Sequence, residues 1–253
     1  MIYDLQKASL LKRASALLLD VILLATLACG FGMVLSSVFG YDTYIGTMND
    51  CYEKYEQLYG VDFDITVEEF DKLPPETQLL YQQADEAMQN DTEALHAYTM
   101  VINLSLIVVS VSVLLSFLAL EFVVPLLFGN GQTVGKKIFG IALMREDGVR
   151  ISTLSLFVRT VLGKYTIETM IPLLILMMML MGTIGIVGPL VVLVIIVLQL
   201  ALMVTSKTNS AIHDKMAATV AVDLSSQMIF NSPEELMAYK QQVHAENVKK
   251  QTY

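Results

Sequence analysis

Asp20 is the first candidate for a functional residue, because it is the only charged residue in an apolar run that is long enough to cross a membrane. Ala14–Val38 comprises 25 residues, and Lys7, Lys12 and Arg13 precede it. At about 1.5 Å per residue, a helix of this length crosses a hydrocarbon core of about 30 Å. A carboxylate inside such a helix costs about 2.5–3.5 kcal/mol to insert, which predicts a functional or pairing role for Asp20.

Glu121 is a second acid next to an apolar run, and it lies four residues before Pro125. Proline has no N–H to donate to the carbonyl of Glu121. The side-chain carboxylate of Glu121 therefore lies close to a backbone carbonyl that lacks its helical hydrogen bond. Such a pair can hold a cation or a water. The alternative interpretation is an interfacial Glu beside an ordinary helix kink.

Several charges are expected near the inner leaflet, and they do not cancel. Three cations (Arg13, Arg159, Lys164) stand against four carboxylates (Asp20, Glu121, Glu168, Asp214). An excess acid beside a bilayer must bind a proton or a cation. We therefore expect Asp20, Glu121 and Glu168 to bind ions or protons.

The other four charged residues of this group are expected to form ion pairs. Helical side chains lean toward the N-terminus, which turns Arg13 away from Asp20 and toward Asp214. Asp20 is then expected to pair with Arg159, Lys164 or a bound cation, which makes Asp20 the functional acid and Asp214 the structural one. The alternative is that all these charges only lock the helices together.

The composition is that of an integral membrane protein. The chain has 253 residues, 55% of them hydrophobic, and a mean hydropathy of +0.58. The lipid bilayer is thus its first expected partner. Thr169–Ser206 contains no charge over 38 residues and must hold two spans, which gives four spans at 14–38, 98–122, 162–182 and 187–206. A cleaved signal peptide is the rival interpretation of the start, but the run is long and contains Asp20.

Residues 41–97 form an acidic segment, with 14 Asp and Glu against Lys54 and Lys72. This bias predicts an extracytoplasmic insertion, both termini in the cytoplasm, and a multi-pass protein of the cell (plasma) membrane. Tyrosines at helical spacing up to Gly60, a capping box at Thr66 and Glu69, and Pro74-Pro75 predict that the insertion is mostly helical.

A small cytoplasmic β unit is expected beside the spans. Ile138–Met144 and Val149–Ser152 flank Asp147-Gly148 and predict a hairpin, which Ala217–Val222 can join as a third strand. Ser232-Pro233-Glu234-Glu235 predicts the start of a polar tail helix.

Other chemistries fit the sequence poorly. Asp62, Asp64 and Thr66 resemble the start of a calcium loop, but Val67 replaces its required Gly. The Gly131–Lys137 stretch lacks the spacing of a phosphate loop, and His213-Asp214 has no nucleophile motif beside it, while adjacent side chains seldom face each other. We expect no catalytic residues, no metal site, no cofactor, no enzyme activity and no nucleic-acid partner.

Three motifs in order resemble the RDD family of bacterial and archaeal membrane proteins, which is named for an Arg and two Asp. The first is Arg13 with Asp20, and the third is His213-Asp214-Lys215-Met216-Ala217-Ala218-Thr219-Val220. The second runs from Gly131 to Ile141 and contributes Gly131, Gln132, Thr133, Gly135, Lys136 and Gly140. The resemblance covers the spans and the cytoplasmic segments, and it leaves out 41–97 and the tail after Asp223. It implies transport of ions or small ligands.

The expected fold is an all-α membrane protein of four transmembrane helices, with the helical insertion and the β unit attached. The segments are 1–40 (first span), 41–97 (insertion), 98–128 (second span), 129–153 (hairpin), 154–206 (third and fourth spans) and 207–253 (C-terminal segment). One hypothesis is movement of monovalent cations or protons, or of a small ligand, in a homo-oligomer because four spans are few for a transporter. The other is a non-transporting scaffold or assembly factor whose insertion 41–97 binds an envelope protein.

Overall fold

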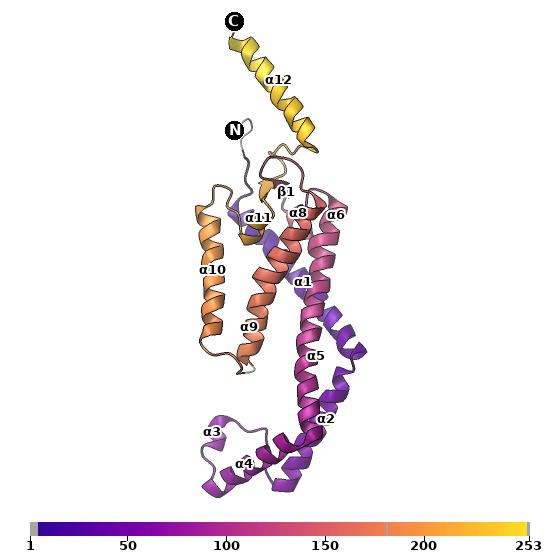
Figure 1. The fold of residues 1–253 in the computed structure, drawn as a ribbon, viewed down its shortest axis with the longest axis vertical. Helices are drawn as coiled ribbons and strands as arrows, with labels where there is room; N and C mark the ends of the chain where they lie inside the picture. Colours follow the sequence, from indigo (N-terminus) through magenta and orange to yellow (C-terminus); the bar gives the residue numbers. More distant parts are fainter. Residues whose placement is uncertain (1–4, 181, 252–253) are drawn as a thin grey trace. The chain divides into compact units, whose positions relative to one another are not determined.

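The computed structural model describes residues 5–180 and 182–251, and the chain divides into two compact units. Unit 1 comprises residues 1–28 and 113–253, and unit 2 comprises residues 29–112. Two helices, α1 (Leu10–Val38) and α5 (Thr92–Phe117), continue from one unit into the other (Figure 1).

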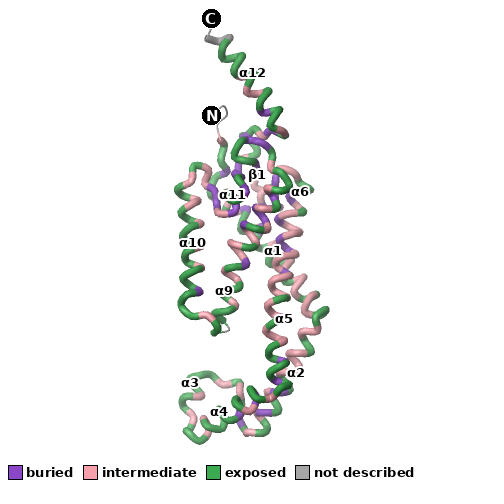
Figure 2. Tube along the Cα trace, viewed as in Figure 1, coloured by how far each residue is buried: buried purple, intermediate pink, exposed green. Residues whose placement is uncertain are grey.

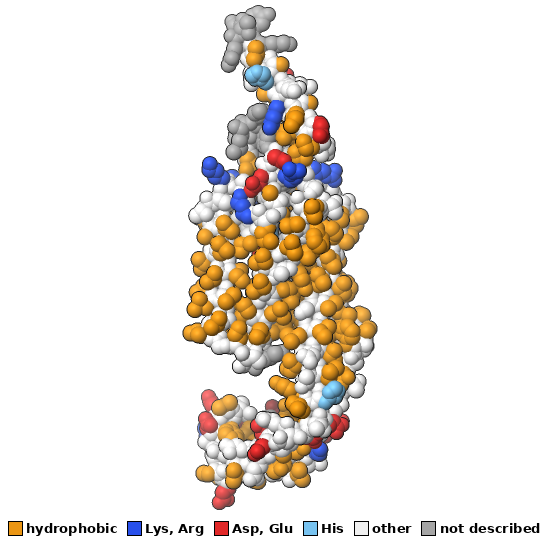
Figure 3. All heavy atoms as spheres, in the orientation of Figure 1, with side chains coloured by type: hydrophobic (Ala, Val, Ile, Leu, Met, Phe, Trp, Pro, Cys, Tyr) orange, Lys and Arg blue, Asp and Glu red, His pale blue; other side chains and the backbone are white. Residues whose placement is uncertain are grey.

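Four helices within the described residues are long and apolar enough to cross a membrane. Their bounds are Leu10–Val38, Thr92–Phe128, Thr153–Leu180 and Val187–Thr205. The last, α10, is mostly exposed, whereas buried residues of unit 1 gather around β1 and α11 (Figure 2). Hydrophobic side chains cover the visible face of the long helices of unit 1, as Figure 3 shows. An apolar surface of this extent needs lipid around it, which agrees with the four predicted spans.

The second and third of these helices each contain a wide, π-helical segment. The second continues from α5 through the π-helix η1 (Leu118–Val123) into α6 (Val124–Phe128). The third consists of α8 (Thr153–Phe157), the π-helix η2 (Val158–Met170) and α9 (Ile171–Leu180).

The third of these helices begins at Thr153, nine residues before Leu162, near which the third span was predicted to begin. Its charged residues do not end the helix because each has a partner, as described below. In η2 the hydrogen bonds run over five residues, for example from the Ile171 N–H to the Thr166 carbonyl. The spacings of five and four between Arg159, Lys164 and Glu168 suit this wider turn. Met181, inside the predicted span 162–182, lies outside the described residues.

A two-stranded antiparallel sheet forms in unit 1 from segments far apart in the sequence. Strand β1 (Ile141–Arg145) pairs with β2 (Thr219–Asp223), with Leu143 opposite Ala221. The outer edge of β2 receives the N-terminal segment, where the Ala8 N–H donates to the Ala221 carbonyl (3.2 Å). Both faces are buried, one of them against Ala16 of α1. The sheet thus ties the start, middle and end of unit 1 together.

The predicted hairpin is only partly present. The turn forms, because the Gly148 N–H donates to the Arg145 carbonyl (2.9 Å), but Val149–Ser152 is not a strand. Its contacts are isolated bridges from Arg150 to Met144 and from Val149 to Phe230. The expected joining strand, in contrast, is β2, and it is the main partner of β1. The backbone hydrogen bonds that β1 was expected to form within the hairpin are therefore formed mainly with β2, which lies far away in the sequence.

Three further helices complete unit 1: α7 (Val134–Ile138), α11 (Ile212–Met216) and α12 (Pro233–Gln251). The predicted cap of the tail helix α12 is present, since the Glu235 N–H donates to Ser232 Oγ (3.2 Å).

Unit 2 contains α2 (Tyr41–Tyr59), α3 (Val67–Phe70) and α4 (Pro75–Asn90) besides the adjoining parts of α1 and α5. Gly60 ends α2 in the left-handed conformation, and Thr66 with Glu69 forms the predicted capping box. Tyr52, Tyr55 and Tyr59 of α2 pack into a small core with Cys51, Met88 and Ala94. These features match the predicted helical segment.

Asp91 connects α2 with the start of α5 through three hydrogen bonds. It accepts from Lys54 Nζ (2.8 Å), from the Tyr55 hydroxyl (2.9 Å) and from the Glu93 N–H (2.9 Å). The bond from Lys54 is the main cause that holds the pKa of Asp91 well below its usual range. Asp91 thus fixes the start of α5 against α2.

Candidate functional site

Asp214, fully buried in α11, is held between two arginines from different membrane helices. Arg13 of α1 contacts its Oδ2 (Nη2, 3.1 Å), and Arg159 of η2 contacts its Oδ1 (Nη2, 2.9 Å; Nε, 3.0 Å). Burial opposes ionisation of Asp214, but interactions with His213, Arg159 and Arg13 more than offset the effect of burial and lower the pKa of Asp214. The predicted Arg13–Asp214 contact is present, and Arg159 completes it.

Asp20 binds neutral donors of the second motif rather than a cation. Its Oδ2 accepts from the Thr133 hydroxyl (2.5 Å), and its Oδ1 accepts from the Gly135 N–H (2.8 Å). The expectation that Asp20 pairs with Arg159 or Lys164 was therefore wrong, whereas the alternative of a bound cation stays a prediction. The motif folds back on α1 and supplies both of its carboxylate oxygens with donors.

Gly135 makes this approach possible. A Cβ built on it would lie 2.3 Å from the carbonyl oxygen of Ala16 and 2.9 Å from Asp20 Oδ1. Any side chain here would push α7 away from α1. The glycine in this motif thus serves close packing of two helices, not a phosphate.

Glu121 is buried in η1 and lies between two lysines. Oε1 accepts a hydrogen bond from Lys164, whereas Oε2 has no hydrogen-bond partner and lies 3.8 Å from Lys136 Nζ. The carbonyl of Glu121 accepts from the Thr160 hydroxyl (2.9 Å). The third membrane helix thus supplies a donor to the carbonyl that Pro125 cannot bond.

Glu168 and His213 form a hydrogen-bonded pair between η2 and α11. Nδ1 of His213 lies 2.7 Å from Oε2 of Glu168, and the His213 N–H donates to Oε1 (3.0 Å). Burial lowers the pKa of His213, and the Asp214 carboxylate offsets this only in part. His213 Nε2 also lies 3.5 Å from Asp214 Oδ1, although adjacent side chains were not expected to meet.

The remaining motif residues shape the backbone around the cluster. Gly131 and Gly140 have positive φ angles of 62° and 65°, and the Gln132 side chain donates to the Ile141 carbonyl (2.8 Å). The Thr219 hydroxyl donates to the Asp214 carbonyl (3.4 Å). These contacts connect the second and third motifs with the sheet.

The structure corrects the charge count. Lys136, assigned only to a motif, joins the cluster through Glu121, so four cations now stand against four carboxylates when His213 is neutral. The excess acid inferred from the sequence is therefore absent from the described cluster. Thr160 was also not identified as a residue of the cluster in the sequence analysis. Its position next to Arg159 in the sequence was the only sign of such a role.

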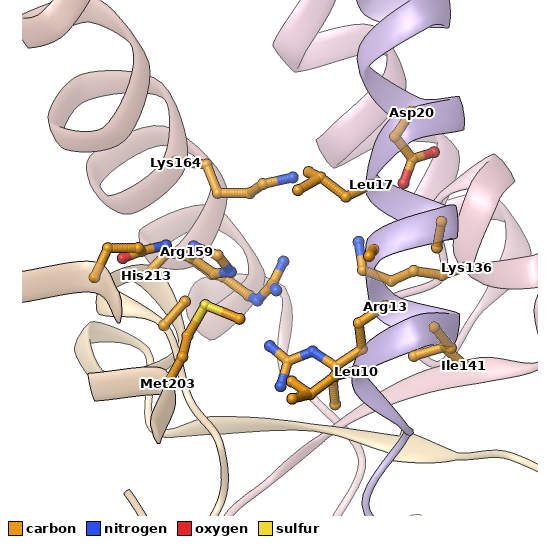
Figure 4. A pocket seen from close by; sticks show the side chains of 15 residues that line it. Leu10, Arg13, Leu17, Asp20, Lys136, Ile141, Arg159, Lys164, Met203 and His213 are labelled. Carbon is orange, nitrogen blue, oxygen red and sulfur yellow. The ribbon is translucent and has the colours of Figure 1, made fainter. Parts of the chain in front are cut away.

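A cavity of about 340 Å³ lies beside the cluster, within unit 1. Figure 4 shows Arg13, Leu17 and Asp20 on α1 facing Arg159 and Lys164 on η2 across it. Its other polar lining residues are Lys136, Gln199 of α10 and His213. The cluster therefore has access to a space large enough for water and small ions.

The sequence of this chain matches the model of one known protein family. A model of the RDD family matches residues 7–218, which include the Arg and both Asp and run across the acidic segment 41–97. The match ends just before Thr219 and Val220 of the third motif. No curated protein and no solved structure matches the chain significantly. The chain, with its four apolar helices, is therefore a membrane protein of the RDD family.

Proposed function

We propose that this protein couples the movement of monovalent cations across the membrane to proton movement. One observation carries the proposal: ionisable side chains of the first three membrane helices converge, with Lys136 and His213, beside one cavity. Ionisable residues are costly within a membrane helix, and they mark ion or proton pathways by default.

The neutral charge of the cluster shapes how such transport would work. An added cation leaves an uncompensated positive charge in a low-dielectric site, which is unfavourable. Release of one proton from the cluster restores neutrality. A cation and a proton should therefore alternate, as in exchange transport.

The proposed orientation places the cluster on the cytoplasmic side of the plasma membrane, with both termini inside and segment 41–97 outside. Lys and Arg gather at the end of unit 1 that holds the sheet, which supports this choice (Figure 3). The 14 acidic residues of segment 41–97 favour the outer side for that segment. The exposed apolar face of α10 is available to a second copy of the chain, in line with a homo-oligomer.

The test is ion-dependent proton flux in proteoliposomes of the purified protein. A pH-sensitive dye inside the vesicles should report alkalinisation or acidification when NaCl or KCl is added outside, but not when choline chloride is added. Empty vesicles are the control. Equal responses to all three salts would exclude cation transport.

A non-transporting membrane scaffold is the second candidate, and one observation favours it. Asp20, Glu168 and Asp214 each have partners for both carboxylate oxygens, as acids that only hold a fold would. In this case the acidic segment 41–97 binds an envelope protein. Deletion of 41–97 then abolishes the cellular phenotype while the four helices stay folded, whereas loss of the phenotype only with changes in the cluster favours transport.

A further inference from the structure

Building on the proposed transport, we infer that Glu121 and Lys136 form the exchange site, at which a monovalent cation and a proton compete. Oε2 of Glu121 is the only buried side-chain oxygen or nitrogen without a hydrogen-bond partner among the described residues. The Glu121 residue is only 3% exposed. An unpaired buried carboxylate oxygen is costly, so it must be compensated by a nearby positive charge.

Lys136 supplies that charge from a position that a small cation can also take. Its Nζ lies 3.8 Å from Glu121 Oε2 and 3.2 Å from Thr133 Oγ1, and the residue lines the cavity. A cation near this position is flanked by a carboxylate and a hydroxyl oxygen, which are ligands for hard cations. The cavity gives ions and protons a route to it.

The other acids are less suited to this role because donors already occupy both of their oxygens. Asp20 accepts from Thr133 and Gly135, and Glu168 accepts two bonds from His213. In each case a cation must first break a hydrogen bond that is 3.0 Å or shorter. At Glu121 Oε2 it displaces only a lysine ammonium at 3.8 Å.

The exchange conserves charge at the site. With Lys136 protonated, the four cations and four carboxylates of the cluster balance; when Lys136 releases its proton into the cavity, the cluster keeps three cations and carries one net negative charge. A monovalent cation restores neutrality, whereas a divalent cation adds a positive charge beside Lys164 and Arg159. The substrate class is therefore the alkali-metal cations.

The surroundings favour release of this proton near neutral pH. Burial lowers the pKa of Lys136 to about 8, opposed by Glu121, while the charges of Lys164 and Arg159 lower it further and Asp20 raises it. These groups come from α1, η1 and η2, the elements around the ammonium. Each is held in a pair or hydrogen bond of its own.

Cation-dependent thermal stability of the full chain in detergent tests the site directly. NaCl and KCl, compared with choline chloride, should raise the melting temperature at about pH 9 and not at about pH 6, because cations bind only when Lys136 is neutral. Lys136→Gln should respond at both pH values and Glu121→Gln at neither. Lys137→Gln is the matched control, since Lys137 stacks on Phe128 instead, and it should behave like the unchanged protein.

Lys136→Arg keeps the positive charge but cannot release a proton in this range, so it should show no cation response at either pH. A cation response of the unchanged protein that is absent at pH 9 or equal at both pH values would overturn the inference. The same holds if Glu121→Gln responds normally. The first of these two outcomes is measured on the unchanged protein alone. It therefore does not depend on whether the variants fold.

Flux measurements separate this inference from the proposed function. If the unchanged protein exchanges cations for protons and Lys136→Arg does so within about twofold, transport stands and the exchange site is wrong. If the pH-dependent cation response occurs but no variant or unchanged protein carries flux, transport is wrong and the site is a binding site. Loss of flux by at least about tenfold in Lys136→Arg, with Lys137→Gln unaffected, supports both.

Discussion

Arg13 and Asp214 are in contact at 3.1 Å although they are 201 residues apart in the chain. One lies at the start of the first membrane helix, and the other follows the fourth. Arg159 of the third helix binds the second oxygen of the same carboxylate. A single buried acid therefore joins three separate parts of unit 1.

Asp214→Asn should lower the stability of the protein strongly. It leaves two buried guanidinium groups without a counter-charge, and breaking a buried ion pair from one side costs about 3–5 kcal/mol. The expected result is a large fall in melting temperature in detergent and in yield.

Asp223→Asn is the matched control for this change. Asp223 pairs with Lys12 (2.5 Å), whose side chain is 44% exposed, and exposed pairs contribute about 0–1 kcal/mol. Equal melting temperatures for the two variants would show that the double pair at Asp214 does not hold the helices together.

The Arg13–Asp214 contact could be predicted because it depends on simple geometry. Helical side chains lean toward the N-terminus, which turns Arg13 toward the membrane side on which Asp214, after the fourth span, was predicted to lie. The four spans could be predicted for a similar reason, since length and hydropathy decide them.

The partners of Asp20 could not be predicted. A hydroxyl from Thr133 and a peptide N–H from Gly135 carry no charge pattern in the sequence, and they lie at the start of α7, 113 and 115 residues after Asp20. The place of Lys136 beside Glu121 depends on the same close packing of α7. For this reason the sequence predicted an excess acid where the structure has none.

Gly135→Ala should destabilise the protein by separating α7 from α1. The new Cβ would lie 2.3 Å from the Ala16 carbonyl oxygen, and backbone must move to make room. Overpacking of this kind costs about 1–3 kcal/mol. Melting temperatures in detergent measure it.

Gly30→Ala is the control for Gly135→Ala, because Gly30 lies within α1 and a Cβ there meets nothing within 4 Å. It should be neutral or stabilise the helix by about 0.5–1 kcal/mol. If Gly135→Ala is as stable as Gly30→Ala, the close contact with Ala16 is not needed.

Asp20→Asn should lose stability as well as any transport, which changes the expectation that Asp20 is purely a functional acid. An amide has one acceptor oxygen, so either the Thr133 hydroxyl or the Gly135 N–H would face an NH₂ group. The cost of leaving a buried donor unsatisfied is about 1–3 kcal/mol.

A double-mutant cycle with Thr133→Val isolates this contact. The two single changes should each lower the melting temperature, and the double change should cost less than their sum, with a coupling of about 0.5–3 kcal/mol. Strict additivity would mean that the Asp20–Thr133 hydrogen bond contributes nothing to stability.

His213→Gln should flatten the dependence of stability on pH between about pH 7.5 and pH 5.5. Burial lowers the pKa of His213 below that of the unfolded chain, about 6.5. In this range the unfolded state thus binds more protons than the folded state, and acidification shifts the equilibrium toward unfolding. The stability that neutral His213 provides is present above the unfolded pKa and is lost as the pH falls below it.

Melting temperatures at a series of pH values test this for the full chain in detergent. The unchanged protein should lose stability as the pH falls through this range, and His213→Gln should lose less, whatever its stability at neutral pH. His244→Gln is the control, because His244 lies exposed on α12 and should leave the slope unchanged. The same slope for His213→Gln and the unchanged protein would show that His213 takes up its proton in the folded chain as readily as in the unfolded chain.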